Sequence, residues 1–147
     1  MRWLLTSVLA AIFIAGLAPA TVSAQDPDQG DAGGLAAIPP LVWQLTFLSN
    51  AGAISDPGRY TAQFLPDGTV SVKADCNWVG GFWSGGNGAL DVTITTSTLV
   101  GCPPGSLEQP FVQALQEATA YAVDGVSLTI TGPAGEMQFS PDMPAMA

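Results

Sequence analysis

The amino-acid sequence predicts an α+β domain that is mainly antiparallel β, with a curled or barrel-like sheet of about eight strands and one packed α-helix. Three observations predict this fold. Short segments that alternate apolar and polar residues recur, turn residues separate them, and one stretch has apolar residues at helical spacing. The chain has 147 residues, a length that suits one such domain.

The first 24 residues have the pattern of a secretory signal peptide. Arg2 gives a positive start, an apolar stretch follows, and Val22-Ser23-Ala24 forms a small-residue cleavage site. The alternative is an uncleaved membrane anchor, for which the stretch is just long enough. Pro19 and the cleavage site favour removal. Because the residue right after the cleavage site is Gln25 and not a cysteine, we expect a periplasmic or secreted protein without a lipid anchor.

The mature chain has an unpatterned segment at each end. Residues 25–40 are rich in Gly, Pro and Asp and predict a flexible acidic linker. Residues 141–147 predict a disordered tail. The folded domain is therefore expected at residues 41–140, which leaves room for one small core.

The first four predicted strands depend on apolar runs and on alternation. Residues 41–48 form an apolar run. Residues 60–64 and 70–74 alternate apolar with polar side chains, and the Pro-Asp-Gly turn between them predicts a β-hairpin. Residues 79–83 form a further strand, interrupted by two glycines.

An extended segment and the only predicted helix follow. Residues 90–100 read as extended chain after a glycine-rich loop. The helix begins after Cys-Pro-Pro-Gly, where Ser106 and Gln109 fit a capping box. Its apolar stripe consists of residues at spacings of four, four and three, namely Leu107, Phe111, Leu115 and Ala118.

A second hairpin and a short strand complete the predicted domain. Residues 120–123 and 127–131 flank Asp124-Gly125, a dipeptide typical of tight hairpin turns. Residues 137–139 form the last strand.

The charge of the chain excludes several classes of function. It has 12 acidic residues, three basic residues and no histidine, for a net charge of −9. This balance argues against binding nucleic acid or an anionic membrane surface. Without histidine there is no Ser-His-Asp triad, Cys-His dyad or His-ligated zinc site. The sequence pairs no two acids as an acid/base couple, so we expect no catalytic residue, cofactor or metal.

The two cysteines, Cys76 and Cys102, predict a disulfide. An exported chain reaches an oxidising compartment, where an even number of cysteines indicates pairing. The alternative is a pair of reactive thiols. Asp75 opposes it, because a neighbouring carboxylate does not favour the thiolate.

Aromatic side chains gather just after Cys76. We take Asn77, Trp78, Phe82 and Trp83 as a candidate binding patch. Phe82 and Trp83 are neighbours in a predicted strand, so they point to opposite faces, and one of them should face outward or into a barrel cavity. The alternative for Asn77 is a turn residue whose side chain bonds nearby backbone.

Several short motifs occur in a familiar order along about 100 residues. They are Trp43-x-Leu45, residues 59–64, Asp67-Gly68-Thr69-Val70, Cys76-Asn77-x-x-x-Gly81-x-Trp83, residues 98–102, a helix with Phe111 and Leu115, Tyr121, and residues 128–130. In this order they resemble the META domain, the HslJ-like family of bacterial envelope proteins. The Cys-Asn-x-x-x-Gly-x-aromatic element is the most specific piece. Trp83 stands where the family usually has Tyr, and Leu99-Val100-Gly101 departs from the usual Met-Ala before the cysteine.

The resemblance implies an antiparallel, barrel-like α+β domain in the periplasm or at the cell surface. It also implies an association with heat or stress tolerance and with resistance to novobiocin. The fold is similar to that of a secretion pilotin whose cracked barrel takes up a lipid tail. The family brings no catalytic residues with it.

We therefore expect a monomeric, exported, non-enzymatic binding or accessory domain of the envelope. Its partner would be an envelope protein or a hydrophobic ligand. One alternative is a disulfide-anchored inhibitor that blocks a secreted hydrolase through a loop. A further alternative is a thiol oxidoreductase, although the cysteines lack Cys-x-x-Cys spacing.

Overall fold

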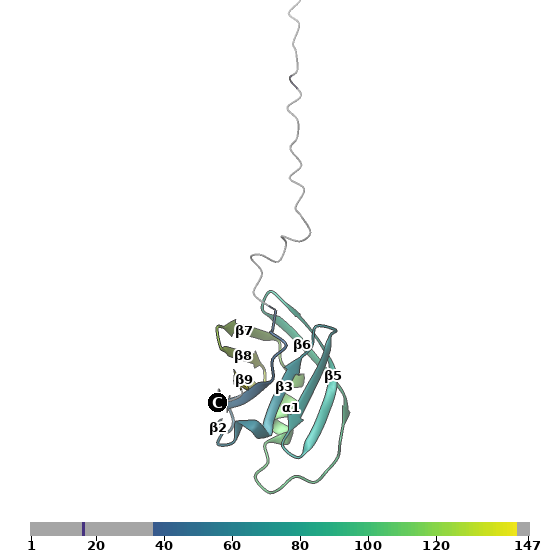
Figure 1. Cartoon of the computed structure of the whole chain (residues 1–147), viewed down its shortest axis with the longest axis vertical. Coiled ribbons are helices and arrows are strands. Elements are labelled where there is room, and N and C mark those ends of the chain that lie inside the picture. The colour runs from purple at the N-terminus through teal and green to yellow at the C-terminus, as the bar shows by residue number, and fades with distance from the viewer. Residues whose placement is uncertain (1–15, 17–36, 144–147) are drawn as a thin grey trace, which may run out of the picture.

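The computed structural model describes Gly16 and residues 37–143 (Figure 1). Apart from Gly16, the predicted signal peptide lies outside this part of the chain, as do most of the predicted linker and residues 144–147 of the predicted tail. The described elements, in chain order, are β1 (Trp43–Leu48), β2 (Gly52–Ala53), the 3₁₀ turn η1 (Pro57–Arg59), β3 (Tyr60–Phe64), β4 (Thr69–Ala74), β5 (Asn77–Gly86), β6 (Ala89–Ser97), α1 (Glu108–Gln116), β7 (Ala120–Asp124), β8 (Ser127–Gly132) and β9 (Gly135–Pro141).

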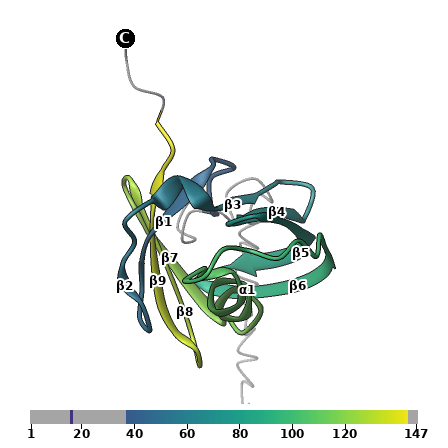
Figure 2. The same cartoon turned by 90° about the horizontal axis from the view of Figure 1, so that it is seen from below.

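Eight of the strands close into an antiparallel barrel. The order is β1-β3-β4-β5-β6-β7-β8-β9, and β9 pairs back onto β1. The short strand β2 adds to the second half of β1, where Phe47 pairs with Ala53. The arrangement confirms the predicted α+β class and the barrel-like sheet. Figure 2 shows the strands surrounding a common interior.

The predicted strands all occur, and β5 and β9 are several residues longer than predicted. Strand β6 ends at Ser97, so residues 98–100, which were predicted to be extended, lie in the following loop. The β5–β6 hairpin continues through Gly86, which was expected to lie in a loop. Its turn is formed by Asn87 and Gly88, both with positive φ, at 52° and 82°. Such a turn matches the twist of paired strands, so the ladder reaches the turn. The prediction missed β2, because two residues carry no alternation.

The barrel is least closed between β6 and β7. Strands β6 and β7 share only the pair Ala89 and Ala120. The helix packs on β4, β6 and β9 and buries Phe111, whose ring lies 5.9 Å from that of Tyr60 and 6.2 Å from that of Phe139. In Figure 2 it is seen nearly end-on beside β6.

The predicted capping box is wrong. The N-cap is Leu107, which makes no side-chain capping bond. The Ser106 hydroxyl accepts a hydrogen bond from the backbone N–H of Glu108 at 3.2 Å. Ser106 therefore lies one residue too early to bond the amide of Gln109.

Large side chains from all eight barrel strands fill the interior. Trp43, Phe64, Phe111 and Phe139 are almost completely buried. Ile38 is also buried, and the Trp43 indole donates to the carbonyl of Pro39 at 3.0 Å. The folded part thus begins before the predicted boundary at residue 41. It also extends through β9, which ends at Pro141.

A bulge in the β5–β6 hairpin depends on glycine. Gly80 pairs with Thr96 and Gly81 with Ile94, so Thr95 is the extra residue. A Cβ on Gly81 would overlap the Thr93 carbonyl and come within 2.9 Å of Ile94 Cα.

We expect Gly81→Ala to lower the free energy of unfolding by about 1–3 kcal/mol, because backbone must move to accept the methyl group. Urea denaturation followed by tryptophan fluorescence measures the change. Gly86→Ala is the matched control in the same strand, since a Cβ there meets nothing within 4 Å. Equal stability of the two variants would refute this explanation of Gly81.

Candidate functional site

A disulfide joins the β4–β5 turn to the segment that follows β6. Cys76 and Cys102 are bonded, with their Cα atoms 5.4 Å apart. The predicted pairing is confirmed, and the described residues include no free cysteine. The bond holds residues 98–107, which connect β6 to α1 and which we call the clamped loop.

Asn77 is the second attachment of the clamped loop. It is the one polar residue in the buried core of the described chain, with 1% of its surface exposed. Its Nδ2 donates to the carbonyl of Val100 and to the carboxylate of Glu108, both at 2.9 Å. Its Oδ1 accepts from the hydroxyl of Thr98 and from the backbone N–H of Val100, both at 2.8 Å. Asn77 is thus not the predicted turn residue: it lies in β5, and its four shortest hydrogen bonds reach residues 21 to 31 positions away, so its polar atoms are all used inside the protein.

An ion pair and a tyrosine form the third attachment. Arg59 donates from Nε to Asp75 Oδ1 at 2.9 Å, and its Nη2 donates to the same oxygen. The Tyr60 hydroxyl accepts from the backbone N–H of Leu107 at 2.9 Å. These residues join the start of β3 and the β4–β5 turn to the end of the clamped loop.

The pKa of Asp75 is lowered despite its burial. Burial alone would raise the pKa of this carboxyl, but hydrogen bonds from Ser106 and Arg59, together with the Arg59 charge, outweigh it. The hydrogen bond with Asp75 in turn raises the pKa of Arg59. Both groups therefore stay charged over the physiological pH range, and the ion pair between Arg59 and Asp75 is maintained throughout it.

These attachments explain the motif residues without assigning them any chemistry. The Arg-Tyr, Asp-Cys-Asn and Thr-Leu-Val-Gly-Cys segments all meet at one end of the barrel. Within the described residues, no three Cys, Asp or Glu side chains gather where they could hold a metal ion. No described helix has the length and apolar character needed to span a membrane.

The four residues of the candidate binding patch divide between two environments. Trp83 points inward, where it is half-buried, donates from Nε1 to the Leu65 carbonyl at 2.9 Å and packs edge-on against Phe64 at 5.4 Å. Trp78 and Phe82 point outward and are 60% and 58% exposed. The expectation that Phe82 and Trp83 face opposite sides is confirmed. Asn77 and Trp83 are occupied within the protein, which leaves two exposed aromatic residues.

Two apolar residues outside the predicted binding patch lie beside Trp78. Leu99 is 92% exposed and Val100 is 57% exposed, both on the clamped loop. The loop is attached to Trp78 directly, because Trp78 N–H donates to the Thr98 hydroxyl and Trp78 C=O accepts from Thr98 N–H, each at 2.9 Å. We call Trp78, Phe82, Leu99 and Val100 the apolar face. The one sequence signal for Leu99 and Val100 is that they form an apolar dipeptide within a polar stretch.

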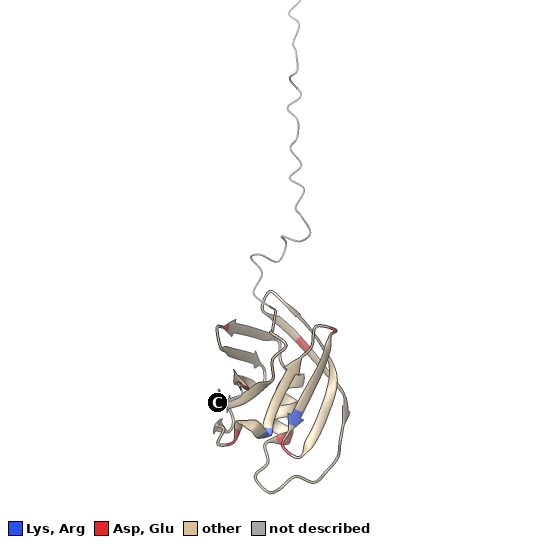
Figure 3. Ribbon diagram, viewed as in Figure 1, with Lys and Arg blue, Asp and Glu red and all other residues tan. Residues whose placement is uncertain are grey.

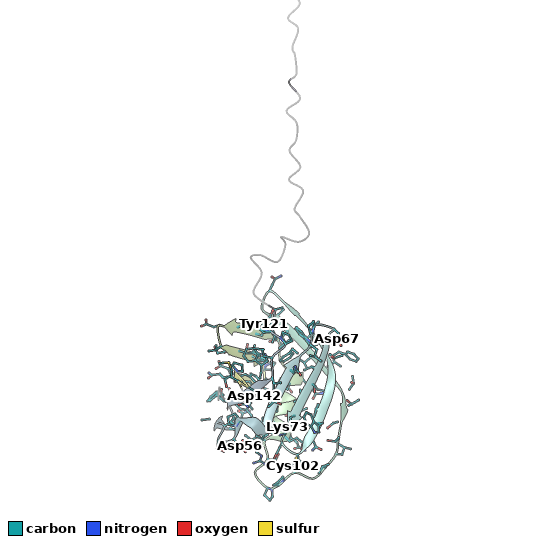
Figure 4. All side chains as sticks on the ribbon, viewed as in Figure 1. Asp56, Asp67, Lys73, Cys102, Tyr121 and Asp142 are labelled. Carbon is teal, nitrogen blue, oxygen red and sulfur yellow. A yellow bond between two sulfur atoms is a disulfide. The ribbon has the colours of Figure 1, made fainter. Side chains whose placement is uncertain are left out.

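Positive charge is confined to one region of the described protein. Its two basic residues, Arg59 and Lys73, lie near each other at the lower ends of β3 and β4 in Figure 3. Arg59 is paired with Asp75. Lys73 pairs across the ladder with Trp78 and has no carboxylate partner in the described chain. In Figure 4, Lys73 and Cys102 lie toward one end of the barrel and Asp67 toward the other.

The comparisons with known proteins agree with this geometry. The model of the META domain family matches residues 37–143, the whole of the barrel and its helix. The chain belongs to the META domain family. A comparison with curated proteins gave no significant match.

Two solved structures share the fold of this META domain. One is a DUF4847 family protein from Bacteroides vulgatus, with 15% identity, a TM-score of 0.53, and coverage of 69% of this chain and 92% of that one. The other is a protein from Burkholderia xenovorans, with 19% identity, a TM-score of 0.57, and coverage of 71% and 83%. At these identities the likeness concerns the fold alone.

Proposed function

We propose that this META domain is an exported, non-enzymatic binding domain of the cell envelope that uses the apolar face to hold another envelope component. The observation that carries the proposal is the gathering of exposed apolar side chains. Eight large apolar residues of the described chain are exposed, and four of them make up the apolar face: Leu99 and Val100 beside Trp78, and Phe82 farther along the same outward side of β5. Apolar side chains grouped on a surface mark interaction sites, whereas single ones are ordinary.

Export is supported by two independent features. The first 24 residues have the signal-peptide pattern, and the disulfide forms in an oxidising compartment. An association with heat or novobiocin tolerance, which the family resemblance implies, belongs to the same proposal. A strain that lacks the gene for this protein should grow more slowly than wild type under heat stress or in the presence of novobiocin.

The rigidity of the apolar face supports binding by a preformed surface. Trp78 lies in a paired strand, and three attachments hold the loop that carries Leu99 and Val100. A surface that is already ordered loses little conformational entropy when a partner binds. The interior, in contrast, is occupied by the core side chains, so we place the site outside the barrel.

Sedimentation with cell envelopes from the host tests the proposal. We expect the wild-type protein to sediment with the envelopes, and the Trp78→Ala/Leu99→Ser variant to lose about tenfold or more in affinity. Val126→Ser is the matched control, because Val126 is 67% exposed on the β7–β8 turn, away from the apolar face. If the double variant sedimented as well as wild type, the apolar face would not be the site.

A second candidate function is inhibition of a secreted hydrolase by the clamped loop. The specific observation in its favour is Leu99, whose side chain is 92% exposed on a loop fixed by a disulfide. Inhibition of a secreted protease or muramidase that Leu99→Ser abolishes would support this candidate. Envelope binding without any such inhibition would favour the first.

A further inference from the structure

A shallow groove runs over the outer surface of β4, β5 and β6, next to the apolar face. Its volume is about 400 Å³, and it is lined by Ser71, Trp78, Val79, Gly80, Thr96, Ser97 and Thr98. Trp78, Gly80 and Phe82 alternate along the outward side of β5. Gly80 has no side chain, and the Thr96 hydroxyl oxygen lies 2.9 Å from where its Cβ would be, so the floor of the groove is low between Trp78 and Phe82. The Cα atoms of these two residues are roughly 13 Å apart at strand spacing.

Two unused hydroxyl groups flank this floor. Ser71 pairs with Gly80 from β4, and Thr96 pairs with Gly80 from β6. Neither hydroxyl makes a hydrogen bond within the described part of the chain, whereas those of Ser97 and Thr98 are bonded inside the protein. A ligand over Gly80 therefore meets a hydrogen-bonding group on each side, and each hydroxyl both donates and accepts.

The lining selects a ligand that has a flat apolar surface and many hydroxyl groups. The indole of Trp78 offers an apolar face with a negative quadrupole, which attracts polarised C–H groups. No ionisable side chain lines the groove, although the protein has 12 acidic residues. The ring of a saccharide combines a C–H face with hydroxyl groups around its edge.

A positive charge beside the groove favours an acidic saccharide over a neutral one. Lys73 lies directly across the ladder from Trp78 and makes only a 3.4 Å hydrogen bond to the Gly58 carbonyl. Although the acidic chain as a whole disfavours extended anionic surfaces, Lys73 is the single basic residue of the described chain without an acidic partner, so it can meet one carboxylate locally. We propose that the groove binds an acidic saccharide of the envelope, with one sugar ring stacked on Trp78, its hydroxyls bonded to Ser71 and Thr96, and its carboxylate toward Lys73. This inference rests on the proposed function and names its ligand class.

Titration calorimetry on the mature protein, at low ionic strength, tests the ligand class. The probes are hexagalacturonate and a hyaluronan hexasaccharide, each compared with its methyl ester, which keeps the sugars and removes the charge. We expect at least one acidic probe to bind, and its ester to bind several-fold more weakly. Trp78→Ala should weaken binding about tenfold or more. Lys73→Gln should reduce the affinity for the acid to that for the ester.

A matched variant and clear negative results complete the test. Val126→Ser should leave saccharide affinity unchanged, because Val126 lies on the β7–β8 turn, outside both the groove and the apolar face. Equal affinity for acid and ester would overturn the acidic class, and no binding of any probe at millimolar concentration would overturn the saccharide proposal. If envelope sedimentation then survived periodate oxidation of the glycans but was lost after protease treatment, the proposed function would stand with a protein partner.

Discussion

Replacing both cysteines by serine should lower the free energy of unfolding by about 3.5 kcal/mol. The disulfide closes a loop between residues 26 apart in sequence, and its removal returns that chain entropy to the unfolded state. Urea denaturation followed by tryptophan fluorescence measures the loss. This loss is large for a small domain, whose total stability is about 5–15 kcal/mol.

The reductant provides an internal control for this prediction. Dithiothreitol should lower the stability of wild type to nearly that of the Cys76→Ser/Cys102→Ser variant, and should leave the variant unchanged. A variant as stable as the oxidised wild type would mean that the bond contributes nothing to the barrel.

Replacing Asn77 should cost about 2–4 kcal/mol, because several buried groups lose their partners together. Asn77→Ala removes the partners of the Val100 carbonyl and N–H and the acceptor for the Thr98 hydroxyl proton, although that hydroxyl still accepts from the Trp78 N–H. Asn77→Asp keeps an acceptor but places a carboxylate against the Val100 carbonyl and the Glu108 carboxylate, both 2.9 Å from Nδ2 in the native protein. Denaturation of both variants at neutral pH measures the loss.

The acidic variant also has a distinctive pH dependence. Burial beside Glu108 raises the pKa of the introduced carboxyl above its unfolded value of about 4. The Asn77→Asp variant is therefore most stable below about pH 4, where the introduced carboxyl is protonated and donates a hydrogen bond. This stability is lost as the pH rises through the pKa of the carboxyl in the folded protein. Asn87→Asp is the matched control, since Asn87 is exposed in a turn. If the two Asp variants were equally stable at neutral pH, the Asn77 network would not hold the loop.

Much of the fold was predictable because its signals are local. Alternation identified β3 and β4, a Pro-Asp-Gly turn joined them, and the helical stripe with Phe111 located α1. The disulfide followed from the number of cysteines and the export signal. Closure of the barrel between β1 and β9 is a contact between segments about 90 residues apart, and the local signals indicated only a curled or barrel-like sheet, without the pairing that closes it.

The candidate site was only partly predictable, because it depends on contacts distant in sequence. Asn77 bonds residues 21 to 31 positions away, and the local sequence indicated only a turn residue. Because Phe82 and Trp83 are neighbours in a strand, the sequence predicted that one of the two rings faces outward, but it did not predict which one. Leu99 was missed since its exposure depends on the disulfide and on Asn77, which hold the loop open to solvent.

The most direct test of the binding face is the response of the tryptophan indole N–H signals in the NMR spectrum of the mature protein. Three of the four tryptophans lie in the described chain, and they report different places. Trp43 is in the core, Trp83 lies against Phe64, and Trp78 is on the outer face of β5. On titration with solubilised envelope material, we predict that the Trp78 signal moves or broadens while those of Trp43 and Trp83 stay in place. Movement of the Trp43 signal, which would place the ligand inside the barrel, or no movement of the Trp78 signal at saturation, would contradict the account.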